Sequence, residues 1–173
     1  MDITVEAVKA LREETGAGIM DCKRALTEAG GDVAQAKAIL REKGIEVAAK
    51  KAGRETDQGL VEAYVHGGRI GALVEVNCET DFVARNPEFK ELARNLAMQV
   101  AAKNPRFLSS DEAPRELIER EQLTPDDVAG MSLLSQLYIR DESRTIEQLI
   151  TEAVQKTGEN IRVRRFSRFE LGK

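Results

Sequence analysis

Histidine and cysteine, whose side chains bind metals and act as bases or nucleophiles, are scarce in this chain. Its 173 residues include a single histidine, His66, and two cysteines, Cys22 and Cys78. Two thiols are too few for a disulfide framework or a zinc site, and one imidazole makes a poor metal site. Cys78 and His66 could in principle form a nucleophile and its base, but the residues around Cys78 match no known nucleophile motif. The sequence therefore favours neither an enzyme nor a metal or cofactor site.

A second candidate for a functional site is the segment 78–84, which reads Cys-Glu-Thr-Asp-Phe-Val-Ala. Thr80 and Asp81 are ordinary turn residues, and Phe82 could be one more core side chain. However, aromatic residues are scarce in this chain, with five Phe, two Tyr and no Trp. Phe82 is the one phenylalanine that falls in a predicted loop rather than on a predicted core stripe.

The end of the chain is basic, whereas the chain as a whole has a formal net charge of -4. Four arginines on a mostly acidic body are a weak footprint for nucleic-acid binding. They favour a strand whose basic face meets solvent or a protein partner. These residues are Arg162, Arg164, Arg165 and Arg168.

The sequence also gives no indication of a membrane protein. No apolar run approaches the roughly 18 to 20 residues needed to span a bilayer. The start of the chain has neither the basic region of a secretory signal nor an arginine-rich transit pattern. We therefore expect a soluble, unprocessed protein of the reducing cytoplasm, without a membrane partner.

The first 50 residues predict a domain of three short helices. The first helix begins at the N-cap Thr4 and is broken by Gly16 and Gly18, and the second ends at Gly30-Gly31. The third opens after Asp32, which resembles the start of a capping box, and is expected to stop at Gly44. The residues predicted to line the inner faces are Val5, Val8, Leu11, Ile19, Cys22, Leu26, Ala29, Val33, Ala36, Ile39 and Leu40.

Met20 and Lys23 lie away from the apolar stripe of the second helix. An exposed methionine beside a lysine suits an adaptable surface for a protein partner, although a plain solvent face would give the same pattern.

Residues 51–59 are polar and contain two glycines, which predicts a linker, and residues 60–173 predict an α+β core domain. Two alternating runs around Gly67-Gly68 predict a β-hairpin. A late strand from Ile161 can complete a three-stranded antiparallel sheet, with a bulge where its alternation slips. The helices expected around this sheet lie after Asn86, as two short helices within 111–138, and after Thr145.

Three stretches of the chain closely resemble the translation elongation factor Ts family, the nucleotide exchange factors of elongation factor Tu. They read LVEVNCETDFVA at 73–84, LREETGAGIMDCK at 11–23 and TGENIRVRRF at 157–166. They occur in the family's order and span nearly the whole chain.

The resemblance implies a mechanism of guanine-nucleotide exchange in which no bond is made or broken. The Thr-Asp-Phe-Val segment enters elongation factor Tu near the Mg²⁺ of the bound nucleotide, so that GDP leaves and GTP can bind. Phe82 would be the apolar wedge, Asp81 would perturb the surroundings of the metal, and Thr80 and Val83 would hold the shape of the segment.

The resemblance also implies a second contact on the N-terminal domain, formed by Arg12, Met20 and Lys23. The chain lacks the G-x-x-x-x-G-K-[ST] motif, so it is not itself expected to be the GTPase.

The chain departs from long members of the family, because it has no second copy of the hairpin and no sustained heptad pattern. It looks like the short form, in which the sheet face can pair with a second subunit, so we expect a homodimer. Residues 135–138, Ser-Gln-Leu-Tyr, stand where many members have Glu-Gln-Pro-Phe, which leaves the contacts of that segment open.

Two other functions are compatible with the sequence. An adaptor whose N-terminal domain resembles ubiquitin-associated domains would lose all binding without residues 1–50. A hydrolase based on Cys78 and His66 would lose its activity on Cys78→Ser and would need no partner protein.

Overall fold

The computed structural model describes residues 3–173, so the first two residues of the predicted N-terminal domain lie outside it. The described chain combines eight α-helices with a three-stranded antiparallel sheet, which confirms the predicted α+β class. It divides into two units. The first comprises Met1–Arg54 and Thr151–Asn160, and the second comprises Glu55–Ile150 and Ile161–Lys173.

Three helices build most of the first unit, and the first of them begins and ends as predicted. The Thr4 hydroxyl accepts a hydrogen bond from the Ala7 amide at 3.2 Å and so starts the first helix. Gly16 has a φ of 66° and closes the same helix, with its amide donating to the Arg12 carbonyl at 2.7 Å. The helices are α1 (Val5–Thr15), α2 (Ile19–Glu28) and α3 (Val33–Lys51).

The core of this unit is small and aliphatic. Leu11, Cys22, Leu26 and Leu40 are each at most 2% exposed, as their helical spacing predicted. Three expected inner residues are instead on the surface, because each lies in the first turn of its helix, where no preceding turn covers it. These are Val5, Ile19 and Val33.

Gly44 does not end α3, which continues for seven more residues to Lys51. A Cβ atom added at Gly44 would lie 3.0 Å from the side-chain oxygen of Gln155 and 3.6 Å from Thr151. The glycine therefore allows the part of helix α8 (Ile146–Thr157) that belongs to this unit, residues 151–157, to pack closely on α3, and the predicted stop was wrong.

The sheet of the second unit has the strand order β1-β2-β5. Gly67 and Gly68 have φ angles of 56° and 68°, which favour glycine, and Arg69 follows them in the loop between His66 and Ile70, so the predicted hairpin is confirmed. The predicted bulge is also present, because the pairing with β5 shifts between Glu75 and Val76. The strands are β1 (Gln58–His66), β2 (Ile70–Cys78) and β5 (Arg162–Glu170).

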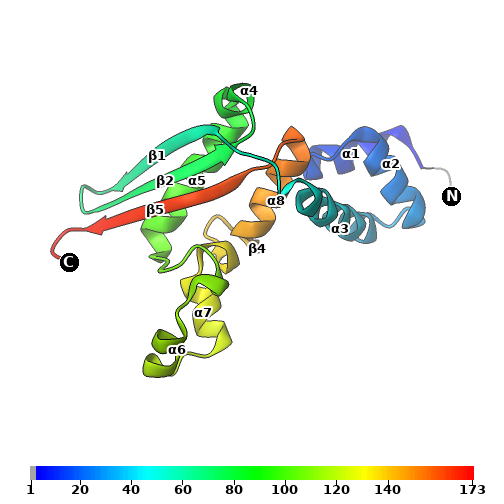
Figure 1. Ribbon diagram of the computed structural model, residues 1–173. Helices are drawn as coiled ribbons and strands as arrows, with labels where there is room; N and C mark the ends of the chain where they lie inside the picture. The colour runs from blue at the N-terminus through cyan, green and yellow to red at the C-terminus, as the bar shows by residue number, and fades with distance from the viewer. Residues whose placement is uncertain (1–2) are drawn as a thin grey trace. The chain divides into compact units, whose positions relative to one another are not determined.

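The two faces of this sheet differ in what covers them. Ala72, Val74 and Val76 point to the inner face and are at most 3% exposed, and α5 (Pro87–Lys103) packs there, behind the strands in Figure 1. The opposite side, which we call the outer sheet face, has the Glu75–Arg165 ion pair and several exposed apolar side chains. These apolar side chains are Val61, Val65, Leu73, Phe169 and Leu171.

The segment between α5 and α8 contains the two predicted short helices and a small two-stranded sheet that was not predicted. Gln99 of α5 is fully buried and attaches this segment. Its amide donates to Gln136 at 3.2 Å and to the Leu137 carbonyl at 3.1 Å, while its own oxygen accepts from the Ile139 amide. The elements are α6 (Arg115–Glu121), α7 (Pro125–Met131), β3 (Leu137–Tyr138) and β4 (Asp141–Thr145).

None of the helices within residues 3–173 combines the length and the apolar character needed to cross a membrane.

Candidate partner-binding site

The segment that carries Phe82 is a short helix rather than the predicted loop. Helix α4 (Asp81–Arg85) follows directly after β2 and stands near the start of α5 (Figure 1). Thr80 is its N-cap, with the side-chain oxygen accepting a hydrogen bond from the Val83 amide at 3.4 Å. Thr80 and Val83 are thus joined to each other within α4.

Both ends of α4 are fixed to the sheet and to α5. At the start, the fully buried thiol of Cys78 donates to the Thr80 carbonyl at 3.2 Å. At the end, the Asn86 amide donates to the Val83 carbonyl at 3.0 Å. The Asn86 side chain then accepts from the Glu88 amide at 2.9 Å and caps α5. No flexible connection therefore separates α4 from the core of its unit.

Phe82 points away from the body of the second unit. Its side chain is 81% exposed, which is the largest value among the exposed large hydrophobic residues of the described chain. Leaving an aromatic ring in water costs free energy, so such a ring on a fixed helix is typical of an anchor for a protein partner. Asp81 and Val83 beside it are only partly exposed.

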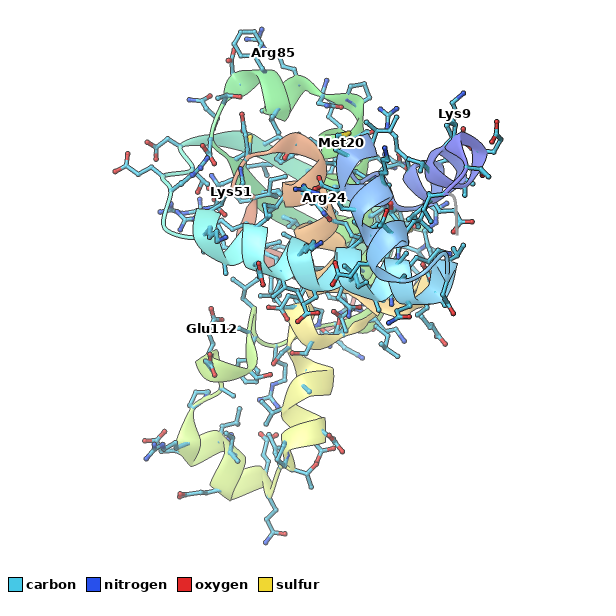
Figure 2. The ribbon with its side chains drawn as sticks, turned by 90° about the vertical axis from the view of Figure 1, so that its right-hand side faces the viewer. Lys9, Met20, Arg24, Lys51, Arg85 and Glu112 are labelled. Atoms are coloured by element: carbon cyan, nitrogen blue, oxygen red, sulfur yellow. The ribbon has the colours of Figure 1, made fainter. Side chains whose placement is uncertain are left out.

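Asp81 is held by Arg85, one helical turn further along α4. The guanidinium lies 2.9 Å from the carboxylate, and both side chains face solvent, so the pair adds little stability. Figure 2 shows Arg85 on α4. Among residues 3–173, no group of three or more His, Cys, Asp or Glu side chains could hold a metal ion.

The residues expected to form the second contact are all exposed on the first unit. Arg12 lies in the last turn of α1, and Met20 and Lys23 are neighbours on α2, where Met20 is 62% exposed (Figure 2). Ile19, which the sequence placed in the core, is 48% exposed beside Met20 and enlarges this apolar surface. Its position as the first residue of α2, directly after the N-cap Gly18, is the signal that could have revealed this.

The two groups of predicted residues belong to different units of the chain. Thr80, Asp81, Phe82 and Val83 lie in the second unit, and the Arg12, Met20 and Lys23 group lies in the first. Each unit therefore carries one of the two candidate surfaces.

The structure does not bring Cys78 and His66 together. In the hairpin, Cys78 pairs with Gln58 at one end and His66 pairs with Ile70 at the other. Eight residues of extended strand place them roughly 26 Å apart. His66 instead bonds to the Tyr64 hydroxyl at 3.2 Å.

Three of the four C-terminal arginines are engaged within the chain. Arg165 donates to Glu75 at 2.7 Å, and this interaction lowers the pKa of the Glu75 carboxyl below its ordinary value. Arg164 also lies 3.7 Å from Glu75. Arg168 donates to Glu170 and to the Ala101 carbonyl. These contacts favour a structural role over binding of phosphates.

Comparison with known proteins gives matches along nearly the whole chain. The family described as Elongation factor TS matches residues 6–130. Elongation factor Ts of Thermotoga petrophila is 49% identical, over 99% of this chain and 98% of the relative. The protein of the same name from Caldanaerobacter subterraneus subsp. tengcongensis is also 49% identical, over 98% and 97%. The one from Finegoldia magna is 46% identical, over 98% and 90%.

Proposed function

The chain belongs to the elongation factor Ts family of translation elongation factors, and we propose that it is the guanine-nucleotide exchange factor of elongation factor Tu. It binds the GDP form of that GTPase and promotes release of GDP, so that GTP can bind. No covalent step is involved.

The observation that carries the proposal is the exposure of Phe82 on a helix fixed at both ends. Because α4 is already ordered, little conformational entropy is lost when the ring enters an apolar gap in the partner. The ring acts as a wedge that favours the open, nucleotide-free arrangement of the GTPase.

The Asp81 carboxylate supplies the second part of this action. Placed near the Mg²⁺ of the bound nucleotide, it competes with the ligands of the metal and weakens the hold on the diphosphate. Thr80 and Val83 keep α4 in shape while this happens. By linkage, a factor that lowers the affinity for GDP is itself bound less tightly by the GDP form, so exchange is reversible.

Arg12, Met20 and Lys23 form a second contact with the same GTPase, and we add Ile19 to it because it is exposed beside Met20. Two linked contacts bind more tightly than either alone, since the first raises the effective concentration of the second.

The test is release of a fluorescent GDP analogue from elongation factor Tu, followed by stopped flow with and without this chain. We expect faster release that saturates with the concentration of the chain. A release rate that does not change on addition of the chain would refute the proposal.

The proposed action on Mg²⁺ is tested by repeating the GDP-release measurement in excess chelator. Once Mg²⁺ has been removed, the nucleotide leaves rapidly without help, and we expect the further acceleration by the chain to shrink. An acceleration of the same size with and without the metal would exclude an action through Mg²⁺.

We also propose that two copies pair through the outer sheet face. Exposed apolar side chains on all three strands form this face, and a second copy would remove them from water. Sedimentation that shows only a 19.1 kDa species at micromolar concentration would contradict it. We place the protein in the cytoplasm, with elongation factor Tu and a second copy of itself as partners and no direct contact with nucleic acid or membrane.

A further inference from the structure

Asn160 lies where the chain leaves the first unit for the last time, and it touches the end of α3. Its side chain is almost fully buried, with the residue 5% exposed. The amide nitrogen donates to the Ala52 carbonyl at 3.3 Å and to the Arg54 carbonyl at 3.0 Å. After Arg54 the chain also passes into the second unit, so one side chain joins the two exits from the first unit.

Helix geometry explains why the carbonyl at the end of α3 needs such a donor. The last carbonyls of a helix have no partner within it, and Ala52 is the C-cap of α3. Lys51, at the end of α3 in Figure 2, makes a reciprocal bond to the Gly158 carbonyl just after α8. Gly158 has a φ of 74°, which lets the chain turn there.

Further contacts tie the same late segment to the N-terminal helices. The Gln155 side chain packs over Gly44 of α3, and the Lys156 side chain lies over Gly16, where a Cβ atom would collide with it. Residues 151–160 are therefore a fourth part of the unit that carries Met20, although the sequence placed them in the core domain.

We propose that Asn160 is a positioning residue for nucleotide exchange, an inference that rests on the proposed function. It holds the two exits of the first unit together, so that the surface around Met20 and the Phe82 helix act on one partner as a linked pair. The benefit of linking two contacts depends on how restricted their connection is. Loosening the connection reduces affinity for the partner, while the action of Phe82 on the bound nucleotide stays the same.

The experiment compares Asn160→Ala and the isosteric Asn160→Asp in the GDP-release assay. Asn160→Asp keeps the size of the side chain but replaces the donor by an oxygen that faces two carbonyls. We expect the half-saturating concentration of both variants to rise about fivefold, with the maximal release rate unchanged. Asn95→Ala is the matched control, because this asparagine makes an exposed bond to Arg140 away from the junction, and we expect wild-type values.

Trypsin gives a readout that does not depend on activity. The junction contains the cleavable residues Lys50, Lys51 and Arg54, and we expect faster cleavage there in both Asn160 variants than in the control. Unchanged cleavage, an unchanged half-saturating concentration, or a fall in the maximal rate would each overturn the proposal for Asn160. A wild-type chain that fails to release GDP refutes the exchange function, whereas cleavage still reports whether Asn160 holds the junction.

Discussion

Helix α4 and the outer sheet face both expose apolar side chains of the second unit, but the two surfaces differ in shape. At α4 a single ring, Phe82, stands out from a helix held at both ends. On the outer sheet face the exposed apolar side chains are spread over three strands, and no one of them dominates. A projecting anchor concentrates binding energy in one residue, whereas a flat face divides it among many. The first arrangement suits a partner that must be released in each cycle, and the second suits a lasting association.

The largest effect is expected from Phe82→Ala. Loss of a dominant anchor costs about 2 kcal/mol or more, so the maximal rate of GDP release should fall about 30-fold. Phe169→Ala is the matched control, because it removes a ring that is also exposed, at 72%, but lies on the outer sheet face. We expect the control to retain the maximal rate in stopped flow. Equal losses in both variants would remove the distinction between the two places.

Leu73→Arg tests whether the outer sheet face is the surface through which two copies pair. Pairing of two copies would bury this unpaired charge, which is costly, so we expect the dissociation constant of the dimer to rise about tenfold or more. Sedimentation equilibrium measures it, and Phe82→Ala serves as the control that leaves self-association unchanged. If the wild type dimerises and the Leu73→Arg variant dimerises equally well, the two copies meet through another surface.

A smaller effect is expected from Thr80→Ala, which keeps the ring but removes the cap of its helix. Loss of an N-cap costs about 1 kcal/mol of helix stability, so we expect the maximal release rate to fall about fivefold. Thr80→Ser keeps the hydroxyl and should behave like the wild type. If Thr80→Ala is fully active, order in α4 does not matter for the action of Phe82.

The smallest effect concerns Glu75, whose carboxylate lies beside Arg165 among the side chains of the outer sheet face. Because Arg165 lowers the pKa of Glu75, the pair stabilises the fold above the ordinary pKa of a glutamate. This contribution is lost as the pH falls from that value through the lowered one. We expect thermal unfolding of Glu75→Gln to depend less on pH in this acid range than that of the wild type. An identical pH dependence would show that the pair does not stabilise the fold.

Local rules predicted the parts of the fold that depend on local chemistry. Thr4, Asn86 and the Gly67-Gly68 pair each cap or turn the chain where expected, because one side chain or one φ angle decides the outcome there. Helix α4 was missed because five residues are too short to show a helical period. Gly44 was misread because its reason is the approach of α8, which is distant in sequence.

The candidate site was found mainly through family resemblance. Composition and spacing singled out Phe82 as an aromatic outside the core stripes, but gave it no role. The first-turn position of Ile19 could have indicated its exposure, whereas the bonds of Asn160 depend on which segments meet in three dimensions, so no local pattern could reveal them.

The bulge in β5 also bears on how the protein avoids misassembly. β5 lies at one edge of the sheet, and the unpaired amides and carbonyls of an edge strand can template pairing with the strand of another chain. The register shift interrupts the regular ladder, and charged side chains at Arg162, Arg164 and Arg165 make an approaching strand desolvate cations. The basic C-terminal strand thereby guards a translation factor against edge-to-edge aggregation.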